Sequence, residues 1–382
     1  MRYLDHAHLA YCTNIHPAET WAETLAMLTR DVLPVRQQFP ADQPYAVGLR
    51  LSAQAANTLC TEESARAELR AWLDEHNAYL FTINGFPYGA FHNARVKENV
   101  YCPDWTTPER LQYTLQLANL IAEFSPKDVE GSVSTLPGSF KAFDADEQLM
   151  FANLYATARH LETLSEEYGK KIHLGLEPEP LGHFENTAET IAFFDRFQDW
   201  TRKRDLPFDR VLTHLGINYD TCHFALEFEE AEKSIAELRA AGLFISKLHL
   251  SNALSFDPQN PEAVAALEPF IEPTYLHQVL LKTDPLTRYQ DLPDYLEAVK
   301  TGTAPEAKEG RVHFHVPLYQ EPLAPLNSTL NHASKALQLL KDDPTLCTHL
   351  EIETYTWGVL PKPLQIPLTQ QLTKEYHWVL EQ

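Results

Sequence analysis

The chain has 382 residues, of which 44% are hydrophobic, 11% aromatic and 22% charged, and this composition excludes a fibre, a disordered chain and a membrane-embedded protein. It carries 31 Lys and Arg against 53 Asp and Glu, which gives a formal net charge of −22. A field of that sign repels phosphate backbones and anionic lipid, so we expect neither a nucleic-acid partner nor insertion into a membrane.

Short β-rich runs alternate with amphipathic helical stretches along most of the chain. We predict eight strands, which begin near residues 8, 45, 78, 131, 172, 215, 243 and 349. Between them, Thr107 followed by Pro108 is typical of a helix start, and the helix predicted over 144–168 ends at Gly169. Eight strand–helix units predict a parallel sheet that closes into an α/β (β/α)8 TIM barrel. A doubly wound sheet would typically have a glycine-rich turn after its first strand, and YCTNIHP has no glycine.

The predicted barrel is one domain over residues 1–382, with two additions. Residues 85–106 follow the third predicted strand and are rich in Gly, Pro and aromatic residues, which favours an ordered lid loop over the C-terminal ends of the strands. Residues 252–318 lie between the seventh and eighth predicted strands and contain two further β-like runs. We expect an insertion with a β-hairpin there.

The chain shows no signal for export or for metal binding through thiolates. Its first residues, MRYLDHAHLAYCTN, lack a basic start followed by an apolar core, and no apolar run approaches the roughly 18 residues of a membrane span. The five cysteines are widely spaced and include no CxxC pair, so we expect reduced thiols. A cytoplasmic location is predicted.

Ionisable side chains occur at the ends of four consecutive predicted strands. They are Glu177 and Glu179 in LGLEPEP, Asp220 and His223 in NYDTCH, His249 in KLHLSN, and Glu351 and Glu353 in LEIETYTW. Because barrel strands end at one face, these side chains should converge on one pocket. Crowded carboxylates in a partly dry site either take up protons or bind a cation. The set predicts one divalent metal ion, with Mn²⁺ favoured over Zn²⁺, Co²⁺ or Mg²⁺.

Each of these residues also has a purely structural interpretation, in which an acid caps a helix or pairs with arginine and His223 packs within a hydrogen-bonded core. The same choice applies to a set of candidate substrate contacts in the lid, on the strands and in the insertion. These candidates are Arg50, Asn84, His92, Lys97, His277, His313 and His315.

The strand-end motifs LEPEP, YDTCH, KLHLSN and LEIETYTW resemble the xylose isomerase-like barrel superfamily, which includes sugar-phosphate isomerases, ketose 3-epimerases and the apurinic endonuclease IV type. Over nearly the whole chain, the ordered motifs TNIHP, FTINGFPYG, LEPEP, YDTCH, YLHQV, HFHVPL and ETYTW are similar to the EboE-type metabolite traffic proteins.

The superfamily resemblance implies a ligand set and one substrate-binding residue. The implied ligands are Glu177, Asp220, His249 and Glu353, and His223 is the implied substrate contact. Glu179 and Glu351 stay open as alternate ligands, because each lies two residues from its neighbour and points the same way on an extended strand.

The leading prediction is a divalent-metal-dependent isomerase or epimerase that acts on a polyhydroxylated carbonyl metabolite such as a sugar, cyclitol or ketose derivative. Glu177 and Glu353 would remove and return the proton. The EboE-type resemblance implies a secondary-metabolite or prenylated-precursor pathway.

Two other functions stay open at this stage. One is a non-enzymatic protein that binds and passes on a metabolite. The other is a metal-dependent phosphoesterase for a small substrate, in which His277, His313 and His315 would hold further ions. In every case we expect a small polyol or sugar-like partner, and a homo-oligomer is left open.

Overall fold

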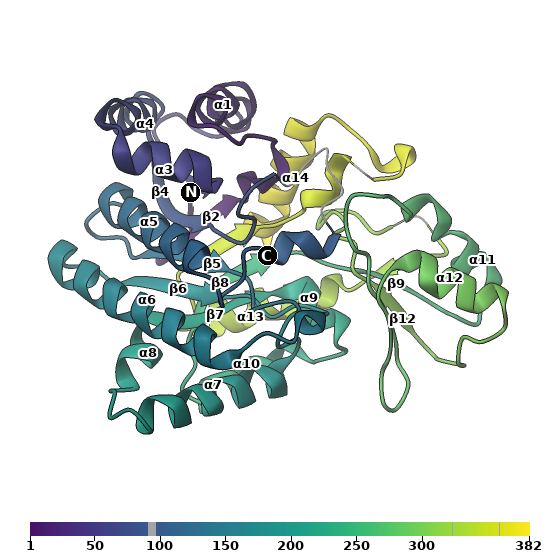
Figure 1. Cartoon of the computed structure of the whole chain (residues 1–382). Coiled ribbons are helices and arrows are strands. Elements are labelled where there is room, and N and C mark those ends of the chain that lie inside the picture. The colour runs from purple at the N-terminus through teal and green to yellow at the C-terminus, as the bar shows by residue number, and fades with distance from the viewer. Residues whose placement is uncertain (91–96, 323, 359) are drawn as a thin grey trace.

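A ring of parallel strands surrounded by helices forms the larger part of the molecule, and a smaller sheet with two helices lies to one side of it (Figure 1). The computed structural model describes residues 1–90, 97–322, 324–358 and 360–382.

Eight parallel strands form the barrel. They are β2 (Ala7–Tyr11), β3 (Tyr45–Arg50), β4 (Ala78–Asn84), β5 (Gly131–Thr135), β6 (Ile172–Leu176), β7 (Leu215–Asp220), β8 (Ile245–Leu250) and β14 (His349–Ile352). Their order is β2-β14-β8-β7-β6-β5-β4-β3, and a parallel bridge between Cys12 and Gly48 closes the ring. The short strand β1 (Arg2–Tyr3) pairs antiparallel with β2. The TIM barrel predicted from the sequence is confirmed.

Helices return the chain from one barrel strand to the next and pack on the outside of the ring. They are α1 (Trp21–Met27), α2 (Leu33–Arg36), α3 (Ala53–Thr61), α4 (Glu63–Glu75), α5 (Pro108–Phe124), α6 (Glu147–Tyr168), α7 (Thr187–Arg202), α8 (Asp209–His214), α9 (Thr221–Leu226), α10 (Ala231–Ala240), α13 (Leu330–Asp342) and α14 (Leu368–Glu381). None of these described helices combines the length and the apolar character that crossing a bilayer requires.

The helix ends and buried faces follow from the local sequence. The Thr107 side chain accepts a hydrogen bond from the Arg110 amide and caps α5. Helix α6 ends at Gly169, whose φ of 66° lies in the left-handed region that favours glycine. On α6, Leu154, Ala158 and Leu161 recur at helical spacing and are buried in the main core.

The second sheet is antiparallel and is formed mostly by the segment between β8 and α13. Its strands, in spatial order, are β11 (Thr287–Tyr289), β10 (Val279–Leu281), β12 (Gly310–Val312), β9 (Leu254–Phe256) and β13 (Asn327–Ser328). Strands β10 and β11 make a hairpin, and helices α11 (Pro261–Ala265) and α12 (Leu292–Lys300) accompany the sheet. It has its own hydrophobic core, which Trp357 and Leu360 extend from beyond β14.

Candidate metal centre

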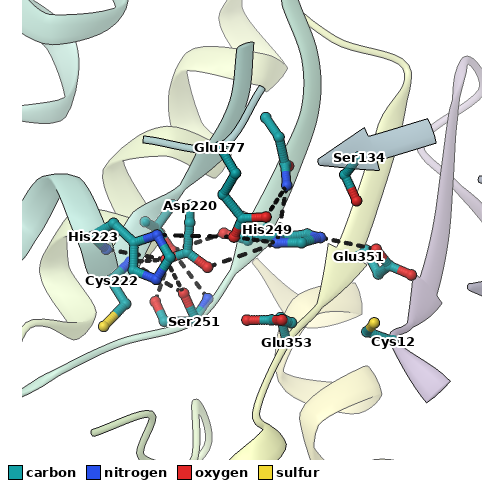
Figure 2. A network of polar contacts seen from close by, with 12 residues as sticks. Cys12, Ser134, Glu177, Asp220, Cys222, His223, His249, Ser251, Glu351 and Glu353 are labelled. Carbon is teal, nitrogen blue, oxygen red and sulfur yellow. Dashed lines mark hydrogen bonds and ion pairs between the residues drawn. The ribbon is translucent and has the colours of Figure 1, made fainter. Parts of the chain in front are cut away.

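Four buried acidic and imidazole side chains meet at the C-terminal ends of four barrel strands. Glu177 follows β6, Asp220 ends β7, His249 lies on β8 and Glu353 follows β14. Each offers one oxygen or nitrogen atom, and these four atoms all lie within 4.8 Å of one another. Figure 2 shows the four side chains around a common space. The structure therefore brings together residues that are up to 176 positions apart in the chain (353 − 177).

Asp220 uses one carboxylate oxygen for the fold and leaves the other for a ligand. Its Oδ1 accepts hydrogen bonds from the amides of Cys222 at 2.7 Å and His223 at 3.1 Å, which caps the start of α9. The Ser251 hydroxyl also donates to Oδ1, at 2.6 Å. Oδ2 is buried, has no hydrogen-bond partner among the described residues and lies 3.8 Å from His249 Nδ1. A buried carboxylate oxygen in this state is the observation expected of a cation ligand.

Glu177 and His249 are held in place by neighbours on adjacent strands. Asn218 Nδ2 donates to Glu177 Oε2 at 2.7 Å, and Glu177 Oε1 lies 3.1 Å from His249 Nδ1. The other ring nitrogen, His249 Nε2, lies 2.9 Å from Glu351 Oε2. Burial lowers the pKa of His249, but the Glu177 and Glu351 carboxylates outweigh burial and raise this pKa to about 10.

Glu353 completes the group from the opposite side of the barrel mouth. Asn14 Nδ2 donates to Glu353 Oε1 at 2.8 Å. Burial raises the pKa of Glu353 well above 4.5, and the negative charges of Glu177 and Asp220 raise it further, against the opposing effect of His249. Three carboxylates this close repel one another, and a divalent cation relieves that repulsion.

The donor set fits a divalent metal ion. It offers three carboxylates and one imidazole, which suits Mg²⁺, Mn²⁺, Co²⁺ or Zn²⁺ and does not suit an ion that prefers thiolates. Two observations support the same conclusion: Asp220 Oδ2 has no hydrogen-bond partner among the described residues, and the negative charges of Glu177 and Asp220 lie close to Glu353.

The two alternate glutamates lie outside this group of four. Glu351 is fully buried below it and accepts a hydrogen bond from Lys247 Nζ at 2.5 Å. Glu179 lines the cavity above, with Oε2 3.9 Å from His223 Nε2, and burial raises its pKa to about 7.

Three histidines, His223, His313 and His315, lie beside the acidic group. Their Nδ1 atoms face carbonyl oxygens at 3.0, 2.7 and 2.5 Å respectively, so in the neutral rings Nδ1 carries the proton and Nε2 has a free lone pair. Nε2 of His313 and Nε2 of His315 are only 3.3 Å apart. Burial lowers the pKa of His315 to about 4 and the pKa of His313 well below 6.5, so both rings are neutral at pH 7.

Two expected substrate contacts, His277 and Arg50, make hydrogen bonds within the protein. Both ring nitrogens of His277 have partners, with Nδ1 2.8 Å from the His313 carbonyl and Nε2 2.9 Å from Glu272 Oε1. Arg50 donates to the Ala18 carbonyl at 2.8 Å and to Glu19 Oε1 at 2.9 Å, and so fixes the segment after β2. Neither His277 nor Arg50 is among the described residues that line the cavity.

A cavity opens above the acidic group. Its floor includes Glu177, Glu179 and Glu353, and aromatic side chains form much of its wall. These are Phe86, Tyr101, Tyr275 and Tyr355.

Described residues of the 85–106 segment and of the second sheet's segment both line this cavity. Asn84 and Lys97 line it, as expected, and Lys97 is ion-paired with Asp291 of the second sheet's segment. His92, also an expected contact, lies outside the described residues. His313 and His223 line the cavity too, whereas His315 is not among the lining residues that the structure describes.

Neither a family model nor a curated protein matches the chain. Among solved structures, a xylose isomerase-like TIM barrel protein from Mycobacterium smegmatis, crystallised in complex with magnesium, aligns over 100% of this chain and 98% of its own. The TM-score is 0.51 and the sequence identity is 11%. The fold is a xylose isomerase-like TIM barrel.

Two other solved structures align with lower TM-scores and slightly higher sequence identities. The probable 3-DHS dehydratase AsbF involved in petrobactin synthesis from Bacillus anthracis covers 97% of both chains at 13% identity, with a TM-score of 0.46. A structure of L-ribulose 3-epimerase covers 71% of this chain and 80% of its own at 14% identity, with a TM-score of 0.38. At these identities the likeness is one of fold.

Two polar residues of this xylose isomerase-like barrel were missed in the sequence analysis. Asn218 lies two positions before Asp220 on β7, and Lys247 lies two positions before His249 on β8. Because side chains two apart share a face of a strand, both point into the barrel beneath the acidic group. A charged residue inside an otherwise apolar strand was the available signal for Lys247.

Proposed function

We propose that the protein is a divalent-metal-dependent isomerase or epimerase that acts on a polyhydroxylated carbonyl metabolite, such as a sugar, cyclitol or ketose derivative. The observation that carries this proposal is the buried group of Glu177, Asp220, His249 and Glu353 at the floor of a cavity. A bound divalent cation would supply Lewis-acid polarisation of adjacent substrate oxygens.

Two residues of the group would mainly bind the ion, and the other two would also transfer a proton. Asp220 and His249 are fully buried and would hold the ion, because neither lines the cavity among the described residues. Glu177 and Glu353 line the cavity and enter the group from different strands. Each can therefore reach a substrate carbon, which is the arrangement needed to take a proton from one carbon and return it. The aromatic wall would exclude water from the reacting atoms.

Solvent deuterium exchange tests the proton-transfer roles. Ketoses and cyclitol ketones are incubated with Mn²⁺-loaded protein in D₂O, and deuterium incorporation is followed by NMR. We expect exchange into at least one compound by the wild type, and a loss of about 10²-fold or more in Glu353→Gln. Glu63→Gln, a change at a side chain that is 94% exposed, is the matched control and should exchange like the wild type. Unchanged exchange in a folded Glu353→Gln protein would exclude the role of Glu353.

We favour Mn²⁺ as the ion, followed by Mg²⁺, Zn²⁺ and Co²⁺, because the donors are mainly carboxylates with one imidazole. The structural relative from Mycobacterium smegmatis was crystallised with magnesium, which is compatible with an oxygen-rich site. Metal analysis of protein purified without added chelator tests the identity of the ion.

A second candidate is a metal-dependent phosphoesterase for a small substrate. The observation in its favour is the cluster of His223, His313 and His315, whose Nε2 lone pairs face the space beside the acidic group. His277, which the sequence suggested as a further ligand, has both ring nitrogens occupied. About one bound ion per chain would support isomerisation, and two or three would support hydrolysis.

For the cellular role, we propose an EboE-type protein of a secondary-metabolite or prenylated-precursor pathway in the cytoplasm, with a small polyol or sugar-like partner. The support is the ordered set of motifs along the sequence, from TNIHP to ETYTW. Tight binding of such a metabolite without deuterium exchange or any other turnover would favour a binding and traffic protein instead.

A further inference from the structure

A buried ion pair lies directly beneath the metal centre. Lys247 and Glu351 are each 0% exposed, and Lys247 Nζ donates to Glu351 Oε2 at 2.5 Å and to the Ser134 hydroxyl at 2.9 Å. Each lies two positions before a residue of the acidic group, His249 on β8 and Glu353 beyond β14. Neither is among the described residues that line the cavity, so neither is placed to touch a substrate.

The pair contacts the metal centre through His249. Glu351 Oε2, which already accepts from Lys247, lies 2.9 Å from His249 Nε2 (Figure 2). A carboxylate beside a lysine is ionised and can only accept, so His249 Nε2 must carry a proton and donate it. When the ring loses its second proton, as binding of a cation requires, the lone pair is therefore on Nδ1, the nitrogen that faces Glu177 and Asp220. Metal-binding histidines commonly use such a carboxylate partner, which fixes the tautomer and the orientation of the ring.

The barrel is shaped to admit Glu351 at this position. A Cβ atom on Gly48 of β3, which β2 separates from β14, would lie 2.1 Å from Glu351 Oε1 and 2.6 Å from the Tyr11 carbonyl oxygen. Only glycine therefore leaves space for the carboxylate where β2 and β3 close the ring.

The stability of the fold does not explain why this pair is present. Burying two charges costs desolvation free energy, and apolar residues of similar volume are often as stabilising or more so. Glu351 Oε1 also has no hydrogen-bond partner among the described residues, which adds to the cost. An apolar pair could reproduce neither the contact with His249 nor the hydrogen bond to Ser134, and of these two the contact with His249 reaches the metal centre.

We propose that Lys247 and Glu351 are positioning residues, which hold His249 with its proton on Nε2 and thereby set the affinity of the centre for a divalent cation. Lys247 keeps Glu351 ionised and turned toward the ring, and Glu351 orients the ring toward the ion. This inference rests on the proposed metal centre and adds to it two residues that bind neither the ion nor the substrate.

The test compares Mn²⁺ dissociation constants, measured from the EPR signal of free Mn²⁺, in the wild type and in the double variant Lys247→Met/Glu351→Leu. The double variant removes both charges together, so neither is left buried alone. We expect a 10–100-fold loss of affinity. The matched control is Thr82→Val, which also removes a buried polar contact inside the barrel. The Ser132 hydroxyl donates to Thr82 Oγ1 at 2.7 Å, and this hydrogen bond does not involve His249. Its affinity should stay within about twofold of the wild type.

The outcomes separate this inference from the proposed function. A folded double variant that binds Mn²⁺ like the wild type would overturn the positioning role and leave the metal centre intact. A wild type that does not bind Mn²⁺, Mg²⁺ or Zn²⁺ would overturn both.

A second measurement does not depend on the double variant. In Zn²⁺-loaded protein with ¹⁵N-labelled histidine, one imidazole should show a metal-bound Nδ1 and a protonated Nε2, and the His249→Gln variant assigns that signal by its loss. The opposite pattern, with Nε2 bound to the metal, would overturn the proposal even if the double variant fails to fold.

Discussion

Asp220 links the metal centre to the backbone at the scale of a single residue. Its Oδ1 accepts from two amides of α9 and from Ser251, while Oδ2 faces His249 without a hydrogen bond. The hydrogen bonds to Oδ1 fix the direction of Oδ2, so the helix start and the ligand geometry depend on the same carboxylate.

Replacing Asp220 with Asn separates these two tasks. The Asn side-chain oxygen can still cap α9, but the variant loses the negative charge and the free carboxylate oxygen. We expect near-native far-UV circular dichroism and a loss of Mn²⁺ affinity of about 10–100-fold or more, the range found for changes to residues that only support a ligand. Isothermal titration with Mn²⁺ measures it. Wild-type affinity in this variant would remove Asp220 from the ligand set.

We expect the stability of the fold to depend on pH through Glu375 on α14, which is not one of the four residues of the metal centre. Its Oε1 accepts from the Leu318 amide at 3.1 Å and the Thr354 hydroxyl at 2.8 Å, and burial raises its pKa to about 8 despite these bonds. The folded state therefore binds a proton between pH 4.5 and 8 that the unfolded state has released, so this residue lowers stability as pH rises through that window.

The Glu375→Gln variant should lack this pH dependence. Its free energy of unfolding relative to the wild type should rise between pH 5 and pH 8, by on the order of 1 kcal/mol per pH unit in the middle of the window. Urea unfolding at pH 5, 6, 7 and 8 measures the difference, and parallel profiles for the two proteins would contradict the shifted pKa.

Residue-level prediction from the sequence was limited by strand phase. Glu177 and Glu179, like Glu351 and Glu353, are two positions apart, so periodicity alone placed both members of each pair on one face. What distinguishes them is depth in the barrel: Lys247 holds Glu351 below the acidic group, and Glu179 lies above it beside His223. No local pattern carries that information, because it depends on the register between strands far apart in sequence.

At the scale of elements, the space for the Glu351 side chain inside the barrel depends on one glycine of β3, a strand that β2 separates from β14. Gly48→Ala would place a methyl group 2.1 Å from Glu351 Oε1 and 2.6 Å from a backbone oxygen that cannot move freely. We expect a loss of about 1–3 kcal/mol in stability and a displaced Glu351, and therefore weaker Mn²⁺ binding. Gly89→Ala is the control, because a Cβ there meets no atom within 4 Å. Equal melting temperatures for the two variants would contradict the close packing at Gly48.

The barrel strands were predicted one by one, whereas for the second sheet the sequence indicated only an insertion over 252–318 with a β-hairpin. The predicted starts of the eight barrel strands are close to the observed ones, because apolar runs are a strong local signal. The two differences are at β2, which begins one residue earlier than predicted, and at β8, which begins two residues later. The strands of the second sheet are only two or three residues long, and β13 pairs with β9 across more than 70 positions. Pairing of that kind depends on tertiary contacts and leaves little trace in a sequence window.

At the scale of the whole molecule, binding of a cation should stabilise the fold. A ligand that binds only the folded state at 100 times its dissociation constant adds about 2.7 kcal/mol. For a chain of this size that corresponds to a rise in melting temperature of about 3–5 °C. Differential scanning calorimetry with Mn²⁺ against EDTA measures it, and Asp220→Asn, with its about 10–100-fold lower affinity, should show about half of this shift or less. A shift of the same size in both proteins would indicate that the ion binds elsewhere.

The antiparallel sheet beside the barrel has a separate hydrophobic core, yet Leu276 and Gln278 of its segment reach the cavity wall. The four residues of the acidic group, in contrast, lie on barrel strands or directly after them, and His315 of the second sheet's segment contacts the Glu353 carbonyl. We therefore expect a mutant library confined to Leu276 to change which ligands the cavity accepts while the four residues of the acidic group keep their contacts.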